Sequence, residues 1–245
     1  MKKNFKHLLV TCLILTSVTL LAQDEGVSTT GSGGGSSMAI GAKIGANFNQ
    51  FSQPLTNIGG SVGGFVRYQI LDFLEAQGEL IYSQQGGGRM DYTRDFSFID
   101  GPIRNVQYVN RSIMLHNIEV PISARLTMPE FNGGAIVPKL IVGGSYSYNM
   151  AAMEYNDKIF NFVDGTRGLV SNTTENVSLN YFPHNFSVHA GIALDFNLAD
   201  AKVFTMEFKY RKGFSNLNQV MTTITELTDK LYSSAFSVNF SYRIF

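Results

Sequence analysis

Three histidines, His116, His184 and His189, lie beyond the first 37 residues, and histidine is the side chain best suited to general base catalysis near neutral pH. A lipid-modifying enzyme would need one of them within hydrogen-bond reach of a nucleophilic serine, with an acidic group to orient the ring. None of the three has an acidic residue at a spacing typical of such a triad. The histidines therefore favour an incidental role in the fold over catalysis.

Other function classes are also disfavoured by residue type. The sequence has one cysteine, Cys12, and it contains neither a His-x-x-x-His pair nor an acidic calcium-binding loop. Cys12 lies in the N-terminal apolar run, so the rest of the chain offers no thiol for a disulfide or a redox reaction. We therefore expect no metal and no cofactor. The balance of 19 basic and 19 acidic residues argues against a nucleic-acid partner, because phosphate neutralisation requires a basic excess.

Many of the charged residues alternate with apolar ones along extended segments. Side chains of a β-strand point alternately to two faces, so this pattern gives each strand one apolar and one polar face. In a transmembrane β-barrel the apolar face meets lipid and the polar face points inward. The charged residues that we expect inside the barrel are Lys43, Arg67, Glu75, Glu79, Glu119, Arg125, Lys139, Asp195, Glu207, Lys209, Arg211 and Arg243.

These inward charges predict a packed network of ion pairs. Eight strands enclose a space just wide enough for side chains to fill. Buried charges of both signs must pair, since an unpaired charge loses its hydration without compensation. We therefore expect no appreciable conduction, and a narrow ion pathway along the same residues is the alternative.

Eight segments show the alternation and would position these charges. They cover residues 38–48, 62–70, 74–83, 112–126, 138–148, 186–196, 204–211 and 232–245. Short and long connections alternate between them, and outer-membrane barrels have short periplasmic turns and longer external loops. The fold that we predict is an all-β, eight-stranded antiparallel up-and-down transmembrane barrel, with external loops Arg89–Arg111, Met150–Pro183 and Ser215–Leu231. Pro121, which cannot donate to a strand ladder, predicts a bulge or bend in the fourth segment.

The N-terminal residues predict export. Residues 1–22 have a basic start, an apolar run and a cleavage-type Ala22, as in a signal peptide. The run is shorter than the roughly 20 apolar residues of a membrane-spanning helix. Residues 23–37 are rich in glycine and serine and predict a flexible linker, which leaves residues 38–245 for the barrel. We expect the protein in the cell outer membrane, with lipid around the barrel.

The loop Arg89–Arg111 contains four aromatic residues that form a candidate contact surface: Tyr92, Phe96, Phe98 and Tyr108. Exposed aromatic side chains either bind a partner or ligand, or pack the loop over the barrel mouth. The partner that such a surface predicts is another envelope protein, bound through the external loops.

Five short motifs resemble, in their order and spacing, the PorT-like outer-membrane β-barrel family of Bacteroidetes. They are Gly45-Ala46-Asn47-Phe48, Glu79-Leu80-Ile81-Tyr82-Ser83-Gln84, Asn117-Ile118-Glu119-Val120-Pro121, Val142-Gly143-Gly144-Ser145-Tyr146 and Tyr210-Arg211-Lys212-Gly213-Phe214. The resemblance covers residues 39 to 245. It implies an eight-stranded barrel in a family whose functions are mostly unassigned and whose namesake is associated with the type IX secretion system.

The function that we predict is non-enzymatic. The barrel would have a structural or interaction role, and its long external loops would present a binding surface. Two alternatives stay open: a small passive porin-like channel, and an accessory barrel of a type IX secretion complex.

Overall fold

The computed structural model describes residues 38–51, 56–89, 91–97, 101–131, 135–198, 203–218 and 230–244. The predicted signal peptide and linker, Phe98 and Phe245 lie outside these ranges, as does most of the predicted loop Ser215–Leu231. The described part of the chain contains no helix that is long and apolar enough to cross a membrane.

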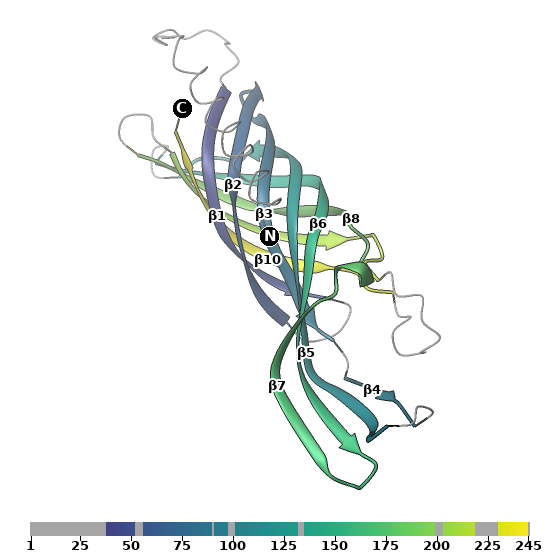
Figure 1. The fold of residues 1–245 in the computed structure, drawn as a ribbon. Helices are drawn as coiled ribbons and strands as arrows, with labels where there is room; N and C mark the ends of the chain where they lie inside the picture. The colour runs from purple at the N-terminus through teal and green to yellow at the C-terminus, as the bar shows by residue number, and fades with distance from the viewer. Residues whose placement is uncertain are drawn as a thin grey trace, which may run out of the picture. The chain divides into compact units, whose positions relative to one another are not determined.

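Ten strands and one short 3₁₀ helix make up the described structure (Figure 1). They are β1 (Met38–Gln50), β2 (Thr56–Leu71), β3 (Leu74–Gly88), β4 (Tyr92–Asp95), β5 (Ile103–Thr127), β6 (Ile136–Phe162), β7 (Arg167–Asn176), η1 (Ser178–Asn180), β8 (His184–Asn197), β9 (Val203–Gly213) and β10 (Ser234–Arg243).

Eight of the strands close into a ring, in the order β1-β2-β3-β5-β6-β8-β9-β10. Consecutive strands of the ring pair antiparallel, and β1 returns to β10 with Ile44 opposite Phe240. Closure leaves no free edge in the ring, so the backbone groups of every strand find partners, as spanning a lipid bilayer requires. The predicted eight-stranded barrel is confirmed.

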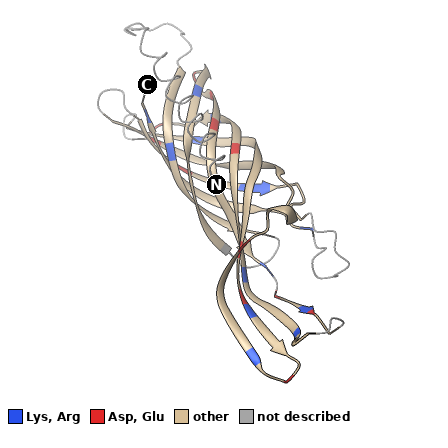
Figure 2. Cartoon of the chain, viewed as in Figure 1, with Lys and Arg blue, Asp and Glu red and all other residues tan. Residues whose placement is uncertain are grey.

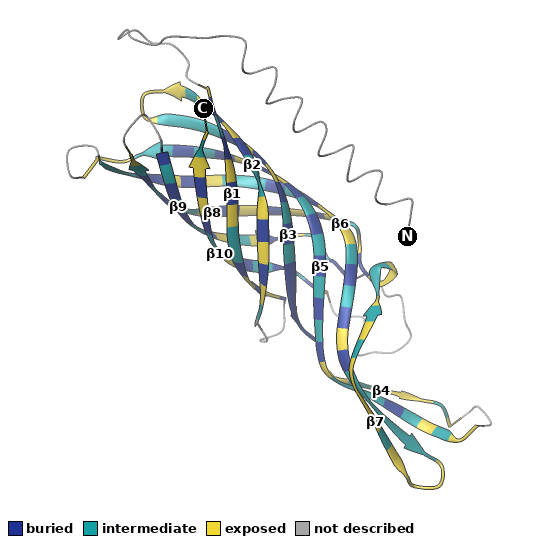
Figure 3. Cartoon of the chain, turned by 60° about the vertical axis from the view of Figure 1, so that its left-hand side comes forward, coloured by how far each residue is buried: buried dark blue, intermediate teal, exposed yellow. Residues whose placement is uncertain are grey.

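The period-two pattern of the sequence becomes an inside and an outside (Figure 3). On β1, Lys43 and Asn47 are buried, whereas Ile44 between them is 62% exposed. The same holds around the ring, where Val62, Ile122 and Ile192 point away from the interior. So large an apolar outer surface is unfavourable in water but suits lipid.

The structure corrects two of the predicted loops. The segments Arg89–Arg111 and Met150–Pro183 are largely strand, because β5 and β6 run on past the ring for totals of 25 and 27 residues. There β4 pairs with β5, and β7 pairs with β6. These four segments form a four-stranded antiparallel extension, here called the arm (Figure 1).

Of the bulge or bend predicted at Pro121, the bulge is wrong. The β3–β5 ladder has Gly78 opposite Ile122 and Ile81 opposite Glu119, which is the same register on both sides of the proline. On its other side Pro121 pairs with Ser145 of β6. The missing N–H interrupts one ladder locally, and the strand keeps its register.

Candidate functional site

The barrel interior contains a cluster of buried ion pairs, here called the interior network. It joins five cations to four carboxylates within 4 Å, and its members come from seven strands: Lys43, Arg67, Arg125, Lys139 and Lys209 with Glu75, Glu79, Asp195 and Glu207. Basic and acidic residues accordingly lie on neighbouring strands of the barrel (Figure 2).

Glu207 on β9 is the centre of this network and has no solvent exposure. Its Oε2 accepts a hydrogen bond from Lys43 Nζ at 2.7 Å, and its Oε1 accepts one from Arg125 Nη1 at 2.6 Å. Lys209 and Arg67 add ion pairs at 3.5 Å and 3.8 Å. Four cations thus pair with the one carboxylate of Glu207, whereas a simple ion pair would join it to a single cation.

Neutral side chains complete the network. Gln77 Oε1 accepts hydrogen bonds from Arg67 Nε at 2.6 Å and from Arg125 Nη1 at 3.0 Å. Thr205 donates to Asp195 at 2.7 Å, and Arg125 Nη2 donates to the same oxygen at 3.1 Å. The prediction named the charged residues only. Gln77 and Thr205 occupy inward positions of the same alternation, so the sequence pattern also predicts that their side chains face the interior.

Two predicted inward residues form a separate pair, and one lies apart. Arg211 pairs with Glu119, which also accepts hydrogen bonds from Ser83 and Gln85. Arg243 makes no ion pair within the described residues and lies opposite Gly41, at the end of the barrel that carries the short turns. The structure therefore brings eleven of the twelve predicted charges into ion pairs.

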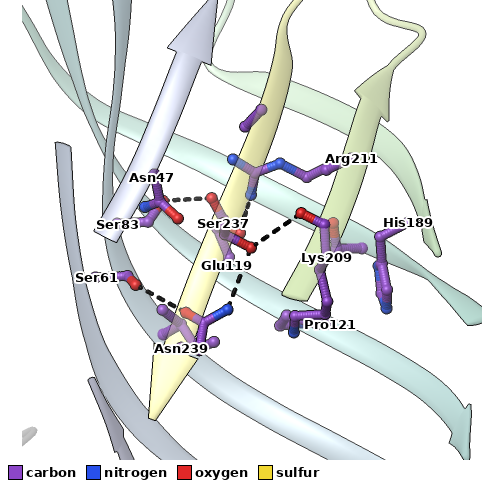
Figure 4. Close-up of a pocket in the computed structure, with 13 residues that line it drawn as sticks. Asn47, Ser61, Ser83, Glu119, Pro121, His189, Lys209, Arg211, Ser237 and Asn239 are labelled. Atoms are coloured by element: carbon purple, nitrogen blue, oxygen red, sulfur yellow. Dashed lines mark hydrogen bonds and ion pairs between the residues drawn. The ribbon is translucent and has the colours of Figure 1, made fainter. Parts of the chain in front are cut away.

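A small polar cavity of about 40 Å³ lies between the interior network and the Arg211–Glu119 pair (Figure 4). Its lining includes Asn47, Ser61, Asn239 and His189. A space of this size holds a few water molecules, at about 10–15 Å³ each, and polar walls would bind them well. It is too small for an organic ligand.

His189 forms the only Ser–His pair of the described interior, with Ser123 Oγ 2.8 Å from its Nε2. The histidine is 5% exposed, and its ring packs against the backbone at Gly143, where an added Cβ would come within 2.7 Å of Nε2. No described acidic residue hydrogen-bonds to this ring. The pair has the groups of a nucleophile and a base, but it lacks an orienting acid and space for a substrate.

The other two histidines lie on the outside of the barrel. His116 Nδ1 and the Tyr82 hydroxyl are 2.6 Å apart, and His184 Nδ1 and the Tyr146 hydroxyl are also 2.6 Å apart. Each histidine thus serves as the hydrogen-bond partner of a tyrosine, an arrangement that suits amphipathic side chains near a membrane surface.

At the end of the barrel opposite the short turns, some inward positions are apolar. Here, Ile113 and Leu115 continue the inward phase of Glu119 on β5, and both are fully buried. They belong to a group that we call the mouth cluster: Phe51, Ile113, Leu115, Ala152, Tyr181, Leu217 and Leu231. Burial raises the pKa of Tyr181 to about 12, so its hydroxyl stays protonated. The cluster packs apolar groups above the charged interior.

A buried ion pair lies where β5 and β6 continue from the ring into the arm. Arg111 on β5 and Glu154 on β6 form two parallel hydrogen bonds of 2.6 Å and 3.1 Å. The Arg111 guanidinium lies 4.4 Å from the ring centroid of Tyr92, and Tyr92 stacks on Tyr108 at 4.5 Å. Burial raises the pKa of Tyr92 to about 12. A bidentate arginine pair fixes orientation as well as distance, so β4, β5 and β6 are held together at this point.

Asp157 ties together two irregular positions of the arm. Asn110 of β5 and Asn172 of β7 have φ values of 53° and 55°, and the strand registers shift beside both. Asparagine tolerates this left-handed conformation better than most residues. Asp157 accepts a hydrogen bond of 2.9 Å from the Asn110 side chain and one of 2.8 Å from the Asn172 N–H. These bonds hold the pKa of its carboxyl below the ordinary range.

The structure brings together three of the four aromatic residues of the candidate contact surface. Tyr92 and Tyr108 stack on the arm, and Phe96 lies nearby with the Arg94 guanidinium 5.3 Å from its ring centroid. Phe98 lies outside the described residues. Within the described ranges, no three His, Cys, Asp or Glu side chains are grouped so that they could hold a metal ion.

Comparison with solved structures finds matches at low identity. Neisserial surface protein A is 12% identical, with a TM-score of 0.44, and the match covers 86% of this chain and 100% of that one. Ail of Yersinia pestis, solved with the heparin analogue sucrose octasulfate, is 11% identical, with a TM-score of 0.37 and coverages of 84% and 99%. The N-terminal barrel domain of Pseudomonas aeruginosa OprF is 10% identical, with a TM-score of 0.34 and coverages of 84% and 99%.

Among curated proteins none matches the sequence. The family model described as "Outer membrane protein beta-barrel domain" matches residues 21–219, which is most of the chain. With its closed ring of eight strands and its apolar outer surface, this chain belongs to the outer membrane protein beta-barrel family and is a protein of the outer membrane.

Proposed function

We propose that this protein is a non-enzymatic interaction protein, in which the barrel anchors the arm and the arm binds another envelope protein. The observation that carries the proposal is the continuation of β5 and β6 beyond the ring into a sheet, in which Arg111 of β5 pairs with Glu154 of β6. A partner that binds a preformed sheet does not have to order a flexible loop, so less free energy is lost on binding.

The direction of the arm follows from the turns. The connections between β2 and β3, β5 and β6, and β8 and β9 are short and lie at the end opposite the arm. Short turns face the periplasm in bacterial outer-membrane barrels. The arm then faces the cell exterior, where envelope or surface proteins are available to it.

Photo-crosslinking in intact cells tests the interaction. A photoreactive residue in place of Leu169, which is 66% exposed on β7, should give one discrete protein adduct. The same residue in place of Ile122, exposed on the lipid-facing side of β5, should give none. Absence of an adduct from Leu169 and from further exposed arm positions such as Val163 and Val170 would contradict the proposal.

The porin-like channel is the alternative, and the filled interior argues against it. Refolded protein in a planar lipid bilayer should show no stable conductance steps, because paired charges and the mouth cluster occupy the lumen. Regular steps of constant size would favour the channel. A small barrel of known conductance, recorded in the same lipid, provides the positive control.

The finer assignment to the PorT-like family is also part of this proposal. It rests on the five sequence motifs, four of which lie in the barrel strands β1, β3, β5 and β6. An accessory role in type IX secretion would depend on that assignment alone, so we rank it below the interaction role.

A further inference from the structure

The arm has two chemically different faces. Strand register places Tyr92 opposite Tyr108, Tyr108 opposite Lys158, and Val106 opposite Phe160, so these side chains share one face. The opposite face carries smaller, mostly polar side chains, among them Thr93, Gln107, Asn105 and Asn161. An aromatic face of this kind, outside the membrane, needs something to cover it.

A pocket of about 320 Å³, here called the arm pocket, lies against that face. Its lining residues come from the sheet and from the connection between β4 and β5: Phe96, Gly101–Ile103, Val106, Tyr108, Lys158 and Phe160. The volume is at the lower end of the roughly 300–1,000 Å³ typical of small-molecule sites.

Both walls of the arm pocket are hydrogen-bonded to the sheet. The Phe96 N–H donates to the Arg104 carbonyl at 2.9 Å, and the Val163 N–H donates to the Pro102 carbonyl at 2.9 Å. The pocket is therefore formed in the ligand-free protein. A ligand would not have to pay for ordering these walls.

The charges around the arm pocket indicate a neutral ligand. Among the lining residues that the structure describes, Lys158 is the one charged side chain. It pairs with the Glu175 carboxylate, and its Nζ lies 5.3 Å from the Tyr108 ring centroid. A ligand anion would have to displace Glu175, and a ligand cation would meet the ammonium of Lys158 with no carboxylate among the described lining residues.

The lining also indicates an aromatic ligand. Phe96, Tyr108 and Phe160 present three rings to the space, and aromatic pairs gain free energy from offset-stacked or edge-to-face contacts beyond the area they bury. Lys158 can add a cation–π contact to a ligand ring without losing its pairing with Glu175. We infer that the arm pocket binds a small neutral molecule that contains an aromatic ring. This site needs no partner protein, although Phe96 and Tyr108 belong also to the candidate contact surface.

Indole is a suitable probe because it is neutral, aromatic and small enough for the pocket. The full chain in lipid nanodiscs would be titrated with indole while methyl resonances are followed by NMR. Ile103 and Val106 in the arm pocket should show saturable shifts, whereas Ile159 and Leu169 on the opposite face should not. No saturable shift up to the solubility limit of indole, or equal shifts on both faces, would overturn the inference.

Charged analogues test the neutral character of the ligand. Tryptamine should bind at least about tenfold more weakly than indole, because its ammonium has no carboxylate partner among the described lining residues. Indole-3-acetate should bind more weakly by up to about fivefold, because it must displace Glu175 from Lys158. Tighter binding of indole-3-acetate would show that Lys158 is available to anions and would overturn this part of the inference. N-acetyl-tryptophanamide, if it binds more tightly than indole, would instead assign the pocket to a side chain of a partner protein.

A matched pair of substitutions on β6 tests the contact itself. Phe160→Leu removes a ring from the pocket, and we expect it to weaken indole binding severalfold. Ile159→Leu changes the neighbouring residue on the opposite face and should leave binding unchanged. Unboiled samples of both variants should keep the gel mobility of the folded barrel, because the arm lies outside the ring. Equal affinities in the two variants would contradict the assignment.

Discussion

Glu207→Gln should lower the free energy of unfolding by about 3–5 kcal/mol, the usual cost of removing one partner from a buried ion pair. The substitution keeps the shape of the side chain and removes its charge. Five cations of the interior network would then face three carboxylates. Lys43 and Arg125 would each lose their shortest ion pair, which is the one with Glu207. Urea titration of the barrel in lipid vesicles measures the change, with the folded fraction read from the mobility of unboiled samples on a gel.

Glu175→Gln is the matched control for this substitution. Glu175 pairs with Lys158 on the arm, but its side chain is 42% exposed, and exposed ion pairs contribute only about 0–1 kcal/mol. We therefore expect a change in unfolding free energy within that range. If Glu207→Gln cost no more than the control, water would have to hydrate the interior charges. The porin-like alternative would then become the better explanation.

The barrel could be predicted because lipid constrains every strand in the same way. A residue such as Ile44 must face outward and its neighbour Lys43 inward, so a single chain shows the period of the whole ring. The inward charges followed from the same phase. Which charges pair was not readable, because Lys43 meets Glu207 across 164 positions of the sequence, through the curvature of the closed barrel.

Lipid constrains the direction of the side chains only where the strands cross the membrane. Outside the membrane the sequence predicted loops instead of the strands of the arm. On the N-terminal side of Arg111 in β5, the strands of the arm meet water. Their register is set by local irregularities and not by lipid. Asp157 illustrates this, because its two asparagine partners come from different strands and their left-handed conformations have no periodic signature. Ile113 and Leu115 are apolar residues at inward positions, and this pattern indicates the mouth cluster. The prediction missed the cluster because it considered only the charged residues of the interior.

Ile192→Arg should strongly destabilise the barrel from its outer surface. Ile192 lies near the middle of β8 with its side chain directed outward, opposite Leu140 of β6 and Phe208 of β9. An arginine facing lipid near the bilayer midplane costs about 2–4 kcal/mol. Urea titration in lipid vesicles should show a loss of unfolding free energy of that size.

Val163→Arg is the control that shows whether this loss of unfolding free energy comes from contact with lipid. Val163 is 69% exposed next to the end of β6 on the arm, so an arginine there stays in water, and we expect a change within about 0.5 kcal/mol. The two substitutions are alike in chemistry and introduce the same charge, so their difference measures the environment alone. Equal and small effects would mean that β8 does not face lipid, and the apolar outer surface would then need a protein partner to cover it.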